Sequence, residues 1–89
     1  NKLYETKNLL SVALVTKVLP ASTSVLIRYR VDGATAWTTI DTHSSGVFSE
    51  FSSNLPKDWN QIQFRFETTG NAEIVEFTFL YETMINIML

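Results

Sequence analysis

The stretch from residue 59 to residue 81, WNQIQFRFETTGNAEIVEFTFLY, contains two runs in which apolar and polar side chains alternate. The apolar members are Ile62, Phe64 and Phe66 in the first run and Val75, Phe77, Phe79 and Tyr81 in the second. A period of two places alternate side chains on opposite faces of a pleated strand. We therefore predict two long strands joined in a hairpin by the turn at residues 68–71, with the aromatic face of each strand turned toward a dry interior.

Stretches of the same kind occupy most of the remaining sequence. They lie at residues 9–18, 25–32, 37–42 and 47–53, and the apolar residues 83–89 offer one more. Asp32-Gly33 is a strong turn signal, because glycine accepts the positive φ of a tight turn, and it predicts a hairpin over residues 25–42. About seven strands separated by short turns are typical of an all-β sandwich or small barrel. We predict an antiparallel two-sheet β-sandwich with jelly-roll-like order and seven to eight strands.

The length of 89 residues predicts a single domain over residues 1–89, and 45% of the residues are hydrophobic, which is enough for a core. The predicted inward-facing residues are Leu10, Val12, Leu14, Ile27, Tyr29, Val31, Trp37, Ile62, Phe64, Phe66, Val75, Phe77 and Phe79. Residues 1–7 are expected to form a mixed leader, and the weak stretch 47–53 is expected either to contain a bulge or to lie at a sheet edge. Because the sequence begins with Asn1, we expect a fragment or C-terminal module of a longer protein.

Composition argues against several classes of function. Seven Lys and Arg against nine Asp and Glu give a net charge of -2, which disfavours nucleic acid as the main partner. The absence of cysteine excludes disulfides, thiolate catalysis and zinc–thiolate sites. No run approaches the 18 or so apolar residues of a membrane span, so we expect no membrane partner.

The single histidine, His43, lies beside Asp41, Ser44 and Ser45, a combination that invites comparison with hydrolases. A hydrolase needs a nucleophile held by a base, and an oxyanion site near rigid elements. No nucleophile elbow follows a strand in this sequence. We therefore expect His43 to be a solvated loop residue.

Carboxylates provide the other candidate chemistry. Pairs drawn from the acids could serve a glycosidase, but most of these acids are expected on the wet faces of strands; they are Glu50, Asp58, Glu67, Glu73, Glu76 and Glu82. A calcium site built from Asp32, Asp41 or Asp58 is conceivable, although no acidic cluster has regular spacing. We predict no enzymatic activity, no cofactor and no catalytic or metal-binding residues, and whether a structural calcium binds stays open.

Charged and aromatic residues define a candidate surface for a ligand or partner. Arg28, Arg30 and Arg65 are expected to face outward from their strands, where they could form a cross-strand ladder with glutamates. Such a ladder is either a solubilising surface or a patch that recognises a partner or glycan. Trp37 and Trp59 bracket loops, and each either plugs an end of the core or offers a flat platform for a sugar ring.

The final stretch TMINIML is apolar and would be costly to leave in water. Its apolar residues are Met84, Ile85, Ile87, Met88 and Leu89. Either the stretch forms a last strand within the fold, or it packs against another chain as an oligomer interface.

Two segments carry a family resemblance. They are SVLIRYRVDGATAWTTIDT and WNQIQFRFETTGNAEIVEFTFLYE, and together they extend from about residue 24 to residue 82. Their order resembles the β-sandwich modules found toward the ends of tail and other virion structural proteins in tailed bacteriophages and prophages. The resemblance implies a non-enzymatic module of a virion, often oligomeric and sometimes in contact with host-surface carbohydrate.

The function expected from these observations is that of a structural or interaction module of a tail or capsid-associated virion protein. It would assemble with other virion subunits, as a homo-oligomer, through sheet edges and the apolar C-terminal segment. The alternative is a carbohydrate-binding module for a cell-surface or polysaccharide glycan, using Trp37, Trp59 or the loops at residues 41–46 and 54–58. The expected location is the virion, an extracellular particle.

Overall fold

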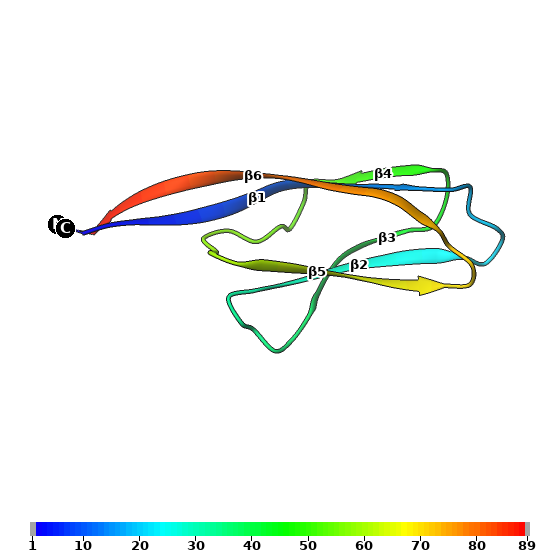
Figure 1. Ribbon diagram of the computed structural model, residues 1–89, viewed down its shortest axis with the longest axis horizontal. Coiled ribbons are helices and arrows are strands. Elements are labelled where there is room, and N and C mark those ends of the chain that lie inside the picture. The colour runs from blue at the N-terminus through cyan, green and yellow to red at the C-terminus, as the bar shows by residue number, and fades with distance from the viewer. Residues whose placement is uncertain (1, 89) are drawn as a thin grey trace.

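The computed structural model describes the backbone of residues 2–88 and the side chains of residues 4–85. Six strands follow one another: β1 (Lys2–Thr16), β2 (Ser24–Val31), β3 (Thr38–His43), β4 (Phe48–Phe51), β5 (Ile62–Thr69) and β6 (Ile74–Met88). They form two antiparallel three-stranded sheets, sheet A in the order β4-β1-β6 and sheet B in the order β3-β2-β5 (Figure 1). The all-β prediction is confirmed.

The predicted number of seven to eight strands is wrong, because the described residues form six. The predicted number treats the stretch 83–89 as a separate strand, but β6 continues without interruption from Ile74 to Met88. No glycine or proline lies in that range to break the pleat. Residues 2–7, predicted to be a leader, are likewise part of β1.

The strands on either side of residues 68–71 are where the sequence predicts them, but they do not form a hairpin. β5 pairs with β2, and β6 pairs with β1. The chain therefore crosses from sheet B to sheet A at the turn, and Phe64 and Phe77 face each other with ring centroids 4.8 Å apart. Alternation has the same appearance in both arrangements, since it specifies the faces of a strand and not its neighbour. The other predicted hairpin is confirmed, because β2 and β3 are antiparallel neighbours.

The core lies between the two sheets and has two adjoining clusters. One contains Leu9, Val12 and Trp59, and the other contains Leu14, Val25 and Ile27. Phe77 of β6 packs against both, and its ring lies 4.8 Å from that of Phe64 and 4.8 Å from that of Phe66. Aromatic rings from both sheets thus fill the interior, with edge-to-face geometry at both contacts.

A β-bulge in β1 explains the main difference between the predicted and observed core. Leu9 pairs with Tyr81 and Ser11 pairs with Leu80, so Leu10 has no partner across the strand. The extra residue puts Leu9 and Val12 on the same face, although regular alternation would separate them. Leu9 is therefore buried and Leu10 is exposed, the reverse of the prediction.

The rest of the predicted core divides by depth. Val12, Leu14 and Ile27 are fully buried. A second group is half-buried: Tyr29, Val31, Ile62, Phe64, Phe66 and Phe77. The prediction that Trp37 faces inward is wrong, because its half-buried ring packs against Arg30 and Arg65 on the outer face of sheet B. Val75 and Phe79 are exposed, although the Phe79 ring still contacts Phe64 at 5.0 Å. Val75 lies at a register shift near the start of β6, where Glu76 pairs with Val15 and Ile74 pairs with Thr16. Beyond Phe77 the aromatic face of β6 becomes partly exposed.

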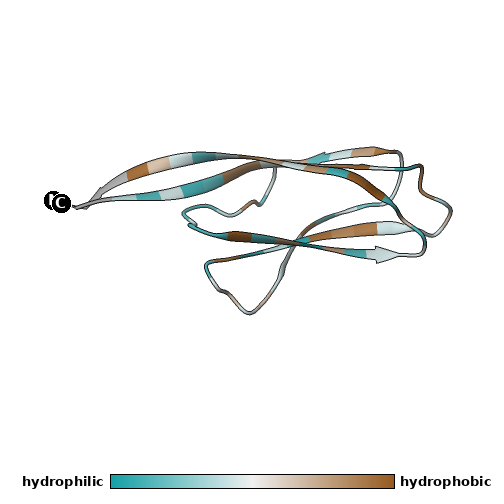
Figure 2. Ribbon diagram, viewed as in Figure 1, coloured by the Kyte–Doolittle hydropathy of each residue, from teal (hydrophilic) through white to brown (hydrophobic). Residues whose placement is uncertain are grey.

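The first residues of β1 and the last residues of β6 form a two-stranded ribbon that extends beyond the rest of the molecule (Figure 1). In the ribbon the strands pair from Lys2 opposite Met88 to Leu9 opposite Tyr81. The ribbon contributes to the elongated shape of the molecule, which measures 56 × 24 × 18 Å. The backbone of the apolar stretch is therefore part of the fold through Met88. Figure 2 shows apolar residues on the projecting part of β6.

The turn between β5 and β6 requires a glycine. Gly70 has a φ of 74°, and a Cβ atom there would lie 2.5 Å from the Cγ2 atom of Thr23. Thr23 is buried and its hydroxyl donates to the carbonyl of Pro20 at 2.6 Å, so it has little freedom to move away.

We expect Gly70→Ala to lower the free energy of unfolding by about 1–3 kcal/mol, through backbone strain together with this contact. Chemical denaturation followed by tryptophan fluorescence measures the change. Gly33→Ala is the matched control, because Gly33 has a φ of 75° but open space around it. Equal losses for the two variants would show that the contact with Thr23 has no effect.

Candidate interaction surfaces

The outer face of sheet B carries the predicted arginines. Val25 and Ile27 of β2 are buried, so the intervening side chains of that strand point outward. Register then places Arg65 of β5 directly opposite Arg28, and Gln63 directly opposite Arg30. Residues opposite each other in a sheet share a face, so β2 and β5 bring all three arginines to one surface.

A single glutamate joins two of these arginines. The Oε2 atom of Glu67 lies 3.4 Å from Nε of Arg28, and its Oε1 atom lies 3.3 Å from Nε of Arg65. The Arg28 Nε–H is buried and has no aligned hydrogen-bond acceptor among the described residues. The contact between Arg28 and Glu67 is therefore a charge pair without hydrogen-bond geometry.

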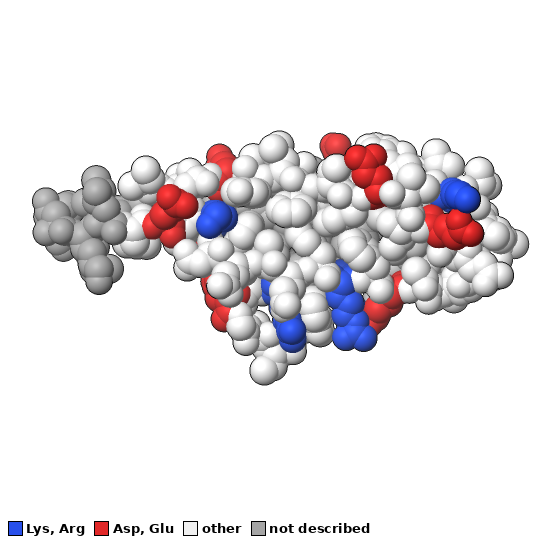
Figure 3. Space-filling view, viewed as in Figure 1, with Lys and Arg blue, Asp and Glu red and all other residues white. Residues whose placement is uncertain are grey.

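Trp37 lies on the same surface, against the arginines. The guanidinium carbon of Arg30 is 4.4 Å from the centre of the indole ring, and that of Arg65 is 5.7 Å away. Arg30 Nε also donates to Oε1 of Gln63 at 2.6 Å. We call this surface the basic face; it consists of Arg28, Arg30, Trp37, Gln63, Arg65 and Glu67, and Figure 3 shows its basic side chains on the sheet B side of the molecule.

The predicted ladder of arginines and glutamates is only partly present. Glu67 takes part in it, whereas Glu76 and Glu82 belong to β6 and hence to sheet A. Trp37 stands where an arginine covers the indole ring, so it does not present an open platform. The fifth predicted surface residue, Trp59, lies elsewhere.

Trp59 is part of the core, with 3% of its surface exposed. Its backbone N–H and C=O both bond to Lys7 of β1, at 3.0 and 2.8 Å, and its ring lies 5.9 Å from Tyr81. The buried indole Nε1–H has no acceptor among the described residues. Trp59 therefore closes the end of the core near the ribbon and is not available to a ligand.

The prediction for His43 is wrong, because this residue is the last of β3 and is fully buried. Its Nε2 atom lies 2.8 Å from the hydroxyl of Thr16, and its Nδ1 atom lies 2.6 Å from the hydroxyl of Ser49. Thr16 and Ser49 belong to β1 and β4, so the imidazole joins sheet B to sheet A. A serine beside a histidine suggests a nucleophile, but this imidazole has no exposed surface through which a substrate could reach it.

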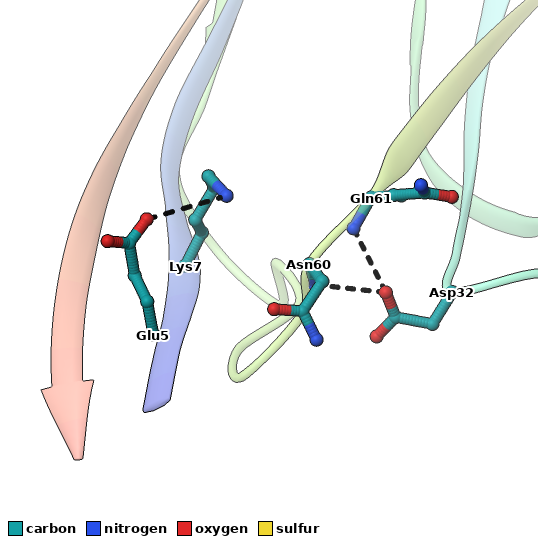
Figure 4. A network of polar contacts seen from close by, with 5 residues as sticks. All are labelled: Glu5, Lys7, Asp32, Asn60 and Gln61. Atoms are coloured by element: carbon teal, nitrogen blue, oxygen red, sulfur yellow. Dashed lines mark hydrogen bonds and ion pairs between the residues drawn. The ribbon is translucent and has the colours of Figure 1, made fainter. Parts of the chain in front are cut away.

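Asp32, one of the three aspartates considered for calcium, bonds to the backbone. The Oδ1 atom of Asp32 accepts hydrogen bonds from the backbone N–H groups of Asn60 and Gln61, both at 2.9 Å (Figure 4). These bonds fix the chain at the start of β5 to the end of β2. Glu5 and Lys7 form a separate ion pair of 4.0 Å on β1. Within the described part of the chain, no three His, Asp or Glu side chains gather in a way that could hold a metal.

A polar groove lies where the open edges of β3 and β4 approach each other. It has a volume of about 220 Å³ and is lined by Ile40, Asp41, Glu50, Phe51, Ser52, Ser53 and Asn54. The sequence suggests the loops at residues 41–46 and 54–58 as glycan contacts, but it does not predict that residues of both loops line one groove. Their meeting depends on how the two sheets are paired, which alternation does not specify.

The second half of β6 carries the predicted oligomer interface. Met84 and Ile85 are exposed, and Ile85 has 70% of its surface accessible. The side chains of Ile87 and Met88, and the whole of Leu89, lie outside the described residues. β6 is also an edge strand, since its order in sheet A leaves one of its sides without a neighbour among the described strands.

Comparison with known proteins adds no assignment: no family model, curated protein or solved structure matches the chain. Among residues 2–88 there is also no helix with the length and apolar character needed to cross a membrane. The function must therefore be inferred from the surfaces themselves.

Proposed function

We propose that this chain is a non-enzymatic structural and interaction module, and that it assembles with copies of itself through the edge and apolar end of β6. The observation that carries the proposal is the character of that edge. β6 is 15 residues long, and residues 74–88 contain no lysine, arginine, glycine or proline. Short length, lysine and proline are among the features with which proteins protect exposed edges, and β6 has none of these three; its charged side chains are Glu76 and Glu82.

The other three edges are less suited to pairing. β4 has four residues, and β3 has six, with a register shift opposite Ile27 and Arg28. β5 has eight residues, against 15 in β6. Main-chain hydrogen bonds along β6 therefore offer the longest continuous ladder, and a second β6 in antiparallel orientation would satisfy both edges at once around a twofold axis.

The apolar side chains at the end of β6 add to this contact. Met84 and Ile85 are neighbours on the strand and thus point to opposite faces of the ribbon. Pairing of two ribbons would give each of these side chains a neighbour on the added strand and remove part of its surface from water. Cross-strand pairs of this kind are worth about 0.2–1 kcal/mol each.

The wider proposal is a β-sandwich module of a tail or capsid-associated virion protein in a tailed bacteriophage, located in the particle. Two observations support it: the resemblance carried by residues 24–82 and the path of the chain. Four of the five connections pass between sheets A and B, and only β2 to β3 stays within one sheet. Frequent crossing between two sheets is the feature that supports a jelly-roll-like order.

We expect Ile85→Lys to abolish the dimer formed through β6 while leaving the fold intact, because it places a positive charge on the edge strand. Light scattering across a concentration series measures the mass. Val18→Lys is the matched control, since Val18 is 78% exposed in the connection after β1, and it should associate like the natural sequence. A natural sequence that stays strictly monomeric at high concentration would contradict the proposal.

A second candidate function is carbohydrate binding, and the polar groove between β3 and β4 favours it. Asp41, Glu50 and Asn54 offer side-chain acceptors in one concave site, beside Phe51. Sugar hydroxyls need such acceptors. A glycan array followed by titration of labelled domain tests this function, and a ligand whose binding is lost in Asp41→Ala would support it.

A further inference from the structure

The outer face of sheet A is acidic. Val12 and Leu14 of β1 are buried, so Ala13 and Val15 point outward. Ala13 pairs with Glu50 of β4, and Val15 pairs with Glu76 of β6, so both glutamates share that outer face.

Glu82 lies on the same face. It pairs with Asn8, whose neighbour Leu9 is buried, and it accepts a hydrogen bond of 3.3 Å from Nδ2 of Asn8. Glu50, Glu76 and Glu82 are all exposed, and we call this surface the acidic face. Lys17, the residue after β1, is already paired with Glu73, with 3.1 Å between its Nζ atom and the Glu73 Oε2 atom.

The basic face lies on the opposite side of the molecule, because it is the outer face of sheet B. Its three arginines and one glutamate leave two positive charges in excess, in a chain whose net charge is -2. Arg28 and Arg65 stand directly opposite each other, an arrangement of like charges that weakens a sheet. A single Glu67 compensates only part of that repulsion, so these arginines are suited to a further anionic partner.

We propose that the basic face of one copy binds the acidic face of a second copy, so that the domains stack face to face. This inference rests on the proposed function, because it adds a second contact to the same assembly. The two faces of one chain carry opposite charges. A second copy would therefore supply an acidic partner for the basic face and a basic partner for the acidic face. An unrelated acidic partner would account only for the arginines.

Apolar side chains on the two faces fit the same contact. Phe48 and Leu80 are exposed, and their pairing with Val15 and Ser11 places them on the acidic face. On the basic face Arg30 covers the ring of Trp37, so Phe48 and Leu80 would pack against the apolar stems of the arginine side chains. Burial of Phe48 and Leu80 in this way would supply attraction that salt does not screen.

The two contacts produce different assemblies. Pairing of β6 with β6 is twofold and stops at a dimer. Stacking of a basic face on an acidic face uses two different surfaces of each copy. Each added copy therefore leaves one basic or acidic face free for the next copy, and the assembly stays open-ended. At low salt, the weight-average mass should keep rising with concentration instead of levelling off at a dimer.

Charge reversal tests the stacking. In one variant Glu50→Lys and Glu76→Lys make both faces basic; in the other Arg30→Glu and Arg65→Glu make both faces acidic. Sedimentation equilibrium at low salt should show each variant alone levelling off at the β6 dimer. An equimolar mixture of the two variants should recover the open-ended rise of mass with concentration. About 0.5 M salt should remove this rise, because it shortens the Debye length to a few ångströms.

The proposal is overturned if each variant alone retains the concentration dependence of the natural sequence, or if the mixture fails to recover it. Circular dichroism checks that both variants fold. If a double variant does not fold, the single changes Glu76→Gln and Arg30→Gln take its place, and each should partly reduce the rise of mass with concentration. Ile85→Lys separates the two contacts, since it removes the dimer but leaves the salt-sensitive stacking. A result that contradicts the stacking therefore does not contradict the β6 dimer, and a result that contradicts the β6 dimer does not contradict the stacking.

Discussion

Replacing Phe77 by alanine is expected to lower the free energy of unfolding by about 3–5 kcal/mol, which approaches the whole stability of a small domain. Phe77 contacts both core clusters, as Phe51 also does, and it lies 4.8 Å from Phe64 and 4.8 Å from Phe66 of the opposite sheet. Its removal would leave a cavity between the sheets that rigid aromatic neighbours fill poorly. Urea denaturation followed by circular dichroism measures the effect.

Leu80→Ala is the matched control on the same strand. Leu80 is 59% exposed on the outer face of sheet A, so its truncation should cost less than about 1 kcal/mol. If both variants lost similar stability, the aromatic layer between the sheets would not be the main source of stability.

Replacing His43 by alanine is also expected to cost about 3–5 kcal/mol. The change removes a fully buried ring and leaves the hydroxyls of Thr16 and Ser49 without the imidazole that now bonds them. These bonds are the side-chain link between β3 of one sheet and β1 and β4 of the other, so their loss should loosen the contact between sheets.

Separate substitutions of the two hydroxyls show whether hydrogen bonding contributes. Thr16→Val and Ser49→Ala should each cost about 1–3 kcal/mol, because each leaves one imidazole nitrogen buried without its partner. The Ser49→Ala effect should nearly vanish in the His43→Ala background, as a double-mutant cycle would reveal. Full additivity would contradict the bond between Ser49 and His43.

Strand positions follow from the sequence because alternation is a local property of the chain. Phe64 and Phe66, for example, are in phase with each other, and that phase decides which face is apolar whatever strand lies beside them. Pairing is not local. The same alternation on both sides of Gly70 fits a hairpin and fits a crossing between sheets, and the structure has the crossing.

Two single-residue features were beyond prediction for a related reason. The unpaired position of Leu10 reverses the faces of its neighbours, and nothing in the letters LLSVAL marks a bulge. His43 precedes Ser44, Ser45 and Gly46, which are typical turn residues, so the sequence predicts that His43 belongs to the loop. In the structure β3 extends one residue beyond the predicted strand and includes His43, which is buried.

The candidate surfaces were partly predictable. Arg28, Arg30 and Arg65 were expected outside because they alternate with apolar residues, and the pairing of β2 with β5 brings them together. Trp37 joins them through contacts that its sequence position does not reveal. The segregation of acidic and basic faces could not be predicted, since it depends on which sheet each strand enters.

The central claim is that β5 and β6 lie in different sheets, which leaves one side of β6 open. Nuclear Overhauser contacts between backbone protons test it most directly, because protons on paired antiparallel strands lie close together. The structure predicts backbone contacts from Phe77 to Leu14 and from Phe64 to Tyr29. Backbone contacts that pair the strand of Phe64 with the strand of Phe77 would contradict the fold and the interaction surfaces built on it.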